Sequence, residues 1–127
     1  MMDLSAPRKI AAELAIERVD VNELEKLLAY YRRVHNDKKF RMIIWRLAVQ
    51  NIFVYSKQTK QYMKKVQSVV LPILPNQPNE ALWFLGWTIR FMRYFNEHQD
   101  EARTLIGKER VQSIAVNMSQ KQRGGRR

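Results

Sequence analysis

The chain has 127 residues, no cysteine, only four glycines and four prolines, and a formal net charge of +11. This length suits one domain, and the lack of cysteine excludes disulfide bonds and thiolate metal sites. Because turn-forming residues are scarce, a sheet-rich fold with frequent tight turns is excluded and an all-α fold is predicted.

Two helices are predicted in the first third of the chain. The first should begin at Ser5, with Pro7 in its first turn, and run to about Arg18. The second should begin at Asp20, which together with Glu23 resembles a capping box, and end near the stretch 35–37. The residues expected to face the core are Ile10, Leu14, Val19, Leu24, Leu27, Leu28 and Tyr31.

A third helix is predicted over about 38–54, capped by Asn36 or Asp37. Its apolar residues are distributed nearly all round the helix, a pattern typical of the buried centre of a bundle. The one polar stripe on this helix consists of Lys39, Arg46, Gln50 and Lys57.

The second half of the chain should hold the remaining helices. A fourth helix opens at Ser56 or Thr59 and runs to about Leu71, before a proline-rich loop at 71–78. Asn79 should cap a fifth helix over 80–97, and a last helical stretch should cover 99–118, where Gly107 can divide it. The inward residues of the fourth helix would be Tyr62, Val66, Val69 and Val70.

These elements predict one compact bundle of five or six helices over 1–118, followed by a basic tail at 119–127. The tail is polar and by itself should be disordered. The N-terminal residues lack the apolar core of a signal peptide, and the longest apolar run, 81–89, is too short to span a bilayer. We therefore expect a cytoplasmic protein that does not cross a membrane. Binding to a membrane surface is disfavoured because the basic helix carries few bulky apolar residues opposite its lysines.

The positive charge is concentrated in one part of the chain. Residues 1–30 carry four bases and six acids, whereas 31–70 carry ten bases and one acid, and no acid lies between Lys38 and Asn79. Within this part, Lys57, Lys60 and Lys64 share one helical face, with Lys65 beside them. The pattern is compatible with a simple solvated face, but its uneven sign favours a polyanionic partner.

The chemistry of lysine indicates what kind of binding to expect. Lysines meet phosphates as point charges, so they position a nucleic-acid strand without reading its sequence. No recognition-helix or ribonucleoprotein signature is present. The remaining bases assigned to this interface are Lys39 and Arg46 in the third helix and Lys121, Arg123, Arg126 and Arg127 in the tail.

The fifth helix carries an aromatic stripe, formed by Trp83, Trp87, Arg90 and Tyr94 at steps of four, three and four. Three interpretations are open. The stripe can belong to the core, it can stack bases, or it can contact another protein subunit.

Catalysis is not expected. The two histidines, His35 and His98, lie near predicted helix ends, and the chain has no nucleophile motif, no phosphate-binding glycine loop and no metal-ligand spacing. We predict that the protein is not an enzyme and needs neither a metal nor a cofactor.

The size, the helical pattern and the stretch SKQTKQYMKKVQ at 56–67, followed by a proline-broken loop and a helix ending RFMRYF, resemble the small subunits of CRISPR effector complexes of the Cascade and type III classes. The resemblance implies a non-catalytic subunit, present in several copies, that packs on other subunits and contacts the target or displaced strand. It would make strand contacts of Lys57, Lys60, Lys64 and Lys65, and also of Arg41 and Arg46. The alternative is a protein–protein adaptor whose basic helix docks on an acidic protein surface.

Overall fold

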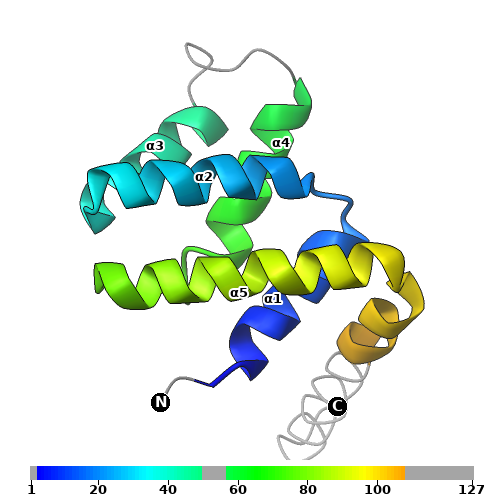
Figure 1. The fold of residues 1–127 in the computed structure, drawn as a ribbon. Helices are drawn as coiled ribbons and strands as arrows, with labels where there is room; N and C mark the ends of the chain where they lie inside the picture. The colour runs from blue at the N-terminus through cyan, green and yellow to red at the C-terminus, as the bar shows by residue number, and fades with distance from the viewer. Residues whose placement is uncertain (1–2, 50–56, 108–127) are drawn as a thin grey trace, which may run out of the picture.

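The computed structural model describes residues 3–49 and 57–107. The described helices are α1 (Ser5–Ile16), α2 (Val21–Val34), α3 (Asp37–Val49), α4 (Lys57–Val69) and α5 (Pro78–Glu97), and a further helical segment covers 99–107 (Figure 1). No strand occurs in these two ranges, which confirms the all-α prediction.

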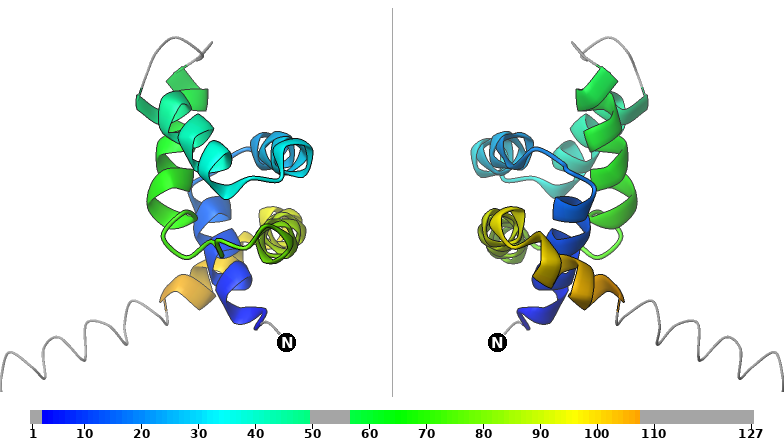
Figure 2. Two further views of the ribbon diagram at one scale, coloured as in Figure 1. Left: turned by 90° about the vertical axis from the view of Figure 1, so that its left-hand side faces the viewer. Right: turned by 90° about the vertical axis from the view of Figure 1, so that its right-hand side faces the viewer.

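The helices form two layers. Helices α2 and α5 run side by side in opposite directions, and α1, α3 and α4 lie across one face of this pair (Figure 2). Helix α1 packs mainly on α5, and α3 packs mainly on α4. The segment 99–107 turns back toward α1, where the Gln99 side-chain amide donates a hydrogen bond of 3.1 Å to the Ala15 carbonyl oxygen. The core therefore lies between the layers.

The most enclosed helix is α1, and the prediction that the third helix is the buried centre is wrong. Along α1 the small residues Ala11, Ala12 and Ala15 are fully buried, so that α5 can approach closely. On α3 only one stripe is buried, formed by Phe40, Ile44 and Ala48. The opposite stripe of α3 has no partner among the described residues, although its side chains are apolar.

The helix ends follow the capping rules, with two corrections. Asp20 accepts a hydrogen bond of 2.9 Å from the Asn22 amide, and Asn36 accepts one of 2.9 Å from the Lys39 amide, so both caps were predicted correctly. Helix α5 is capped by Gln77 and not by Asn79, because Pro78 occupies its first turn and has no amide hydrogen to satisfy.

The second correction concerns the end of α1, which lies at Ile16 and not near Arg18. Arg18 has a φ of 60°, a left-handed conformation that cannot continue the helix. His35 ends α2 in the same way, with a φ of 46°. Both residues stop a helix and let the chain change direction before the next one.

The core residues agree with the periodicity of the sequence. All seven residues expected to face inward from the first two helices are buried, as are Val66 of α4 and Val70 directly after it, whereas Tyr62 and Val69 are only partly buried. Met63, which was not predicted, takes their place in the core. The buried hydroxyl of Thr88 donates to the Phe84 carbonyl oxygen at 2.8 Å and so needs no other partner.

Gly86 sits in the middle of α5, and a β-carbon added there would meet no atom within 4 Å. Glycine in a helix interior costs roughly 0.5–1 kcal/mol relative to alanine. We expect Gly86→Ala to raise the free energy of unfolding by about that amount in a urea titration. A destabilised variant would mean that this helix face is less open than the described residues indicate.

Candidate nucleic-acid interface

The junction between α2 and α3 carries four exposed bases, which we call the basic corner: Arg32, Arg33, Lys38 and Lys39. Arg32 and Arg33 lie in the last turn of α2, where the helix dipole favours positive charge. Lys38 and Lys39 lie in the first turn of α3, where the dipole disfavours it. No carboxylate among the described residues pairs with any of the four. Lys38 and Lys39 therefore do not stabilise α3, so stability of the helix does not explain why two lysines stand at its N-terminus.

The single acid in this region is already bound. Asp37 is the only Asp or Glu between Glu25 and Glu80. Its two carboxylate oxygens accept hydrogen bonds from Nε of Arg41 at 3.0 and 2.9 Å. The charge of Asp37 is therefore compensated inside the protein, and the surrounding bases are left to set the sign of the surface.

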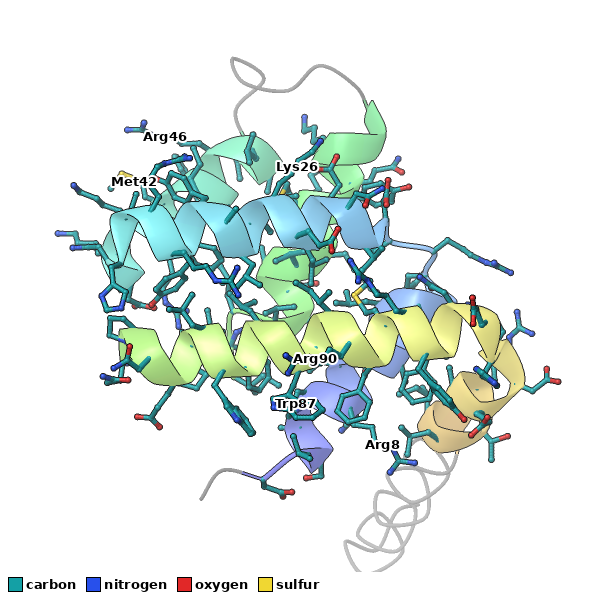
Figure 3. All side chains as sticks on the ribbon, in the orientation of Figure 1. Arg8, Lys26, Met42, Arg46, Trp87 and Arg90 are labelled. Atoms are coloured by element: carbon teal, nitrogen blue, oxygen red, sulfur yellow. The ribbon has the colours of Figure 1, made fainter. Side chains whose placement is uncertain are left out.

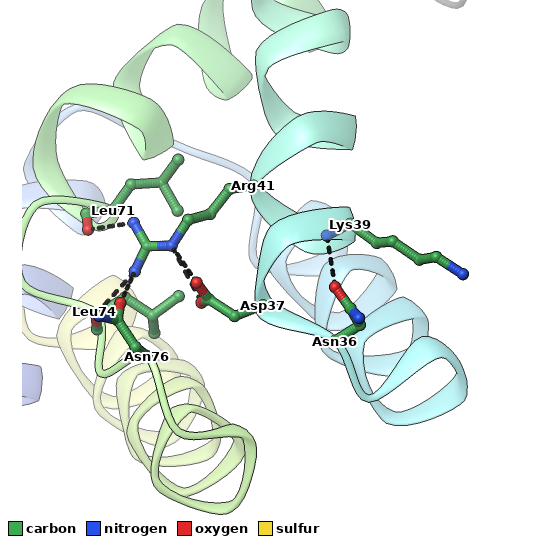
Figure 4. A network of polar contacts seen from close by, with 7 residues as sticks. All are labelled: Asn36, Asp37, Lys39, Arg41, Leu71, Leu74 and Asn76. Carbon is green, nitrogen blue, oxygen red and sulfur yellow. Dashed lines mark hydrogen bonds and ion pairs between the residues drawn. The ribbon is translucent and has the colours of Figure 1, made fainter.

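Arg41 does not lie where a strand contact was predicted. Its Nη1 donates to the carbonyl oxygen of Leu71 at 2.9 Å, and its Nη2 donates to the carbonyl oxygen of Leu74 at 2.9 Å and to Oδ1 of Asn76 at 3.2 Å (Figure 4). With Nε on Asp37, all three guanidinium nitrogens are in use. Arg41 thus fastens the loop before α5 to the start of α3.

The outer face of α3 consists of Met42, Trp45, Arg46 and Val49. The apolar members are 44%, 44% and 50% exposed, large values for such side chains. A surface cavity of about 470 Å³ is lined by Arg41, Met42, Trp45 and Arg46. Figure 3 shows Met42 and Arg46 projecting from α3 away from α5 (Figure 3). Because steps of three and four connect Lys38 to Met42, Trp45 and Val49, this face continues directly from the basic corner.

The lysines of α4 differ in exposure and in their partners, although they form one run in the sequence. Lys64 is exposed and Lys60 partly exposed, but Nζ of Lys65 lies 2.9 Å from Oε1 of Glu17 at the end of α1. Lys57 begins α4, and the position of its side chain lies outside the described residues, as do the tail bases Lys121, Arg123, Arg126 and Arg127. Lys65 therefore links two helices, which its position in a lysine run did not indicate.

The aromatic stripe of α5 lies at the surface and outside the centre of the core. Trp83 packs partly against the core, Trp87 is half-buried, and Tyr94 is 44% exposed. The Tyr94 hydroxyl donates to Oε2 of Glu101 at 2.6 Å, which raises the pKa of Tyr94, and its ring stacks on His98 at 4.1 Å. The buried residues of α5 lie on other faces of the helix, among them Phe84, Ile89 and Met92.

Other site types gain no support from the described residues. These residues contain no group of three or more His, Asp or Glu side chains that could hold a metal ion. Nor is any described helix both long and apolar enough to cross a bilayer.

Comparison with known proteins finds no family model, no curated protein and no solved structure that matches this chain. The interpretation of the interface therefore depends on its own geometry and charge. Of the predicted bases, Lys39 and Arg46 lie on one continuous surface. The sequence reasoning missed Arg32, Arg33, Lys38 and Trp45, although the lack of acids around them was a signal that could have found them.

Proposed function

We propose that the protein is a non-catalytic, sequence-independent nucleic-acid-binding subunit that holds a strand along the basic corner and the outer face of α3. One observation carries this proposal. An exposed tryptophan, Trp45, lies among exposed bases, and the only acid of the region is bound by Arg41. Bases that neutralise phosphates, combined with an aromatic ring that stacks a nucleobase, are typical of surfaces that bind single strands.

The dimensions of this surface suit a short stretch of strand. From Lys38 to Val49 the axis of α3 rises about 16 Å, at about 1.5 Å per residue. Over that length a strand with the spacing it has in a duplex, about 3.4 Å per phosphate, presents about five phosphates. Three exposed bases, Lys38, Lys39 and Arg46, lie along this length, and Arg32 and Arg33 at the end of α2 extend the basic surface beyond it.

The resemblance to CRISPR small subunits supports the same assignment, since it implies a strand-holding subunit that works beside other subunits and further copies of itself. A second candidate function is favoured by the exposure of Met42 and Val49, which a protein partner would bury. That candidate is an adaptor for an acidic protein surface, and it predicts no affinity for free oligonucleotide.

Fluorescence anisotropy with labelled single-stranded DNA, single-stranded RNA and duplex, each over a range of salt concentrations, tests the proposal. We expect single strands of any sequence to bind, with affinity falling roughly a hundredfold between about 50 and 200 mM salt if about five phosphates are contacted. Trp45→Ala should weaken single-strand binding by roughly fivefold or more and leave duplex binding nearly unchanged, because only an unpaired base can stack.

The control variant is Met42→Ala, which removes a similarly exposed side chain from the same face without removing a ring. If no strand binds at low salt, the proposal is wrong and the adaptor function is favoured. If Trp45→Ala and Met42→Ala bind all strands equally well, Trp45 does not stack bases.

A further inference from the structure

A second surface, remote from α3, is formed by α5, α1 and the segment 99–107. It contains an open cavity of about 410 Å³, within the range usual for small-molecule sites. Figure 3 shows Trp87, Arg90 and Arg8 together on the side of α5 away from α3. None of these residues belongs to the proposed strand-binding surface.

One wall of the cavity is aromatic. Trp87, Phe91 and Tyr94 follow each other on α5 at steps of four and three. Phe95, which is buried, lies at the bottom of the cavity. The ring centroids of Trp87 and Phe91 lie 5.8 Å apart. Because Trp87 and Phe91 are only partly buried and Tyr94 is 44% exposed, the wall offers flat apolar area that a planar ring can cover.

The rim of the cavity is cationic. The Arg90 guanidinium lies over the Trp87 ring, 4.8 Å from its centroid, and Arg8 approaches from α1. Neither arginine forms an ion pair with a carboxylate among the described residues. The one acid of the cavity, Glu101, accepts a hydrogen bond of 2.6 Å from the Tyr94 hydroxyl, which occupies part of its acceptor capacity. The cavity thus combines an aromatic wall with two guanidinium groups that form no ion pair among the described residues.

We propose that this cavity binds a nucleotide, with the base on the aromatic wall and the phosphate between Arg8 and Arg90. Arginine binds phosphate oxygens through its planar fork, and two arginines from different helices suit a group with several charged oxygens. The remaining acceptor capacity of Glu101 suits a sugar hydroxyl or a base amino group. A free mononucleotide and an unpaired nucleotide of a strand share this chemistry. The inference does not depend on the proposed function of α3.

Calorimetric titration of the full chain with adenosine 5′-monophosphate, adenosine and ribose 5-phosphate tests the inference. The monophosphate should bind most tightly, because only this ligand has both the ring and the phosphate. In the double variant Arg8→Gln with Arg90→Gln, its affinity should fall by roughly tenfold or more. Adenosine binding should change little in that variant. Trp87→Ala should weaken the binding of adenosine and of the monophosphate alike. The control is Arg103→Gln, because Arg103 is an exposed basic residue outside the cavity.

Competition with a short oligothymidylate identifies the source of the nucleotide. Displacement of the monophosphate by the oligonucleotide supports the cavity as a subsite for a strand, and a lack of displacement supports a free nucleotide as its ligand. The inference is overturned if the monophosphate does not bind at millimolar concentration. It is also overturned if the folded double arginine variant binds it as well as the parent does. Variants of α3 should leave this titration unchanged, so failure of one proposal does not affect the other.

Discussion

The quadruple variant Arg32→Gln, Arg33→Gln, Lys38→Gln and Lys39→Gln is expected to bind single-stranded oligonucleotide roughly a hundredfold or more weakly than the parent at about 0.1 M salt. Each lost phosphate contact removes about 0.7 from the slope of log affinity against log salt for a single strand, so the slope should fall by roughly 3. Anisotropy titrations at four or more salt concentrations measure both quantities.

The variant should remain folded, because all four side chains are exposed and none pairs with a carboxylate among the described residues. Removing Lys38 and Lys39 should even relieve a small dipole repulsion in α3. The matched control is Arg18→Gln, Lys26→Gln, Arg93→Gln and Arg103→Gln, which removes the same number of exposed charges from other parts of the surface. Of these four, Lys26 and Arg93 are exposed and form ion pairs at the surface with Glu23 and Glu25. If both quadruple variants lose affinity equally, total charge matters and the basic corner is not a site.

The sequence predicted that α4 is the main strand-binding helix, and this remains a prediction. The fold shows that one of its four lysines, Lys65, forms an ion pair within the protein. A run of lysines at steps of three and four guarantees a shared helical face but does not reveal what that face meets. The ion pair of Lys65 with Glu17 joins residues 48 positions apart, and a helical pattern in one segment carries no information on such a pair. The predicted strand contact of Lys64, which is exposed, stays a prediction.

The helices themselves could be read from the sequence because their causes are local. The cap at Asp20, the break at His35 and the proline-rich loop depend on residues within a few positions, and each lies close to its predicted place. Burial in α3 could not be read in the same way. A helix that is apolar all round satisfies two different arrangements, a buried centre or a helix with one exposed apolar face. The tertiary packing decides between them, because α3 packs mainly on α4 and its opposite face has no partner among the described residues.

The candidate sites were predictable in composition but not in geometry. A lack of acids over a long stretch is visible in the sequence, and it indicates the sign of the surface. Arg8 lies beside the aromatic wall of α5 because α1 packs on α5 in the folded chain. The two are far apart in the sequence, so no rule based on residue spacing predicts that they meet. The same reason explains Arg41, which was expected to contact a strand and instead binds the loop.

Arg41→Gln is expected to lower the free energy of unfolding by about 2 kcal/mol, and Arg41→Lys by about half as much. Glutamine removes the charge that balances Asp37 and leaves the carbonyl oxygens of Leu71 and Leu74 without their donors. Lysine keeps the charge but cannot donate in three directions from one plane. For a domain of this size the glutamine variant should melt roughly 5–10 °C lower, as measured by circular dichroism.

Arg46→Gln is the matched control for this prediction, since Arg46 is exposed on the same helix and has no partner among the described residues. We expect Arg46→Gln to leave the melting temperature unchanged and to weaken strand binding. Arg41→Lys should lower the melting temperature and leave strand binding unchanged. The reason is that a guanidinium with every nitrogen bonded inside the protein cannot also neutralise a phosphate. If Arg41→Lys melts like the parent but binds strands poorly, Arg41 contacts nucleic acid, and the loop is positioned by other residues.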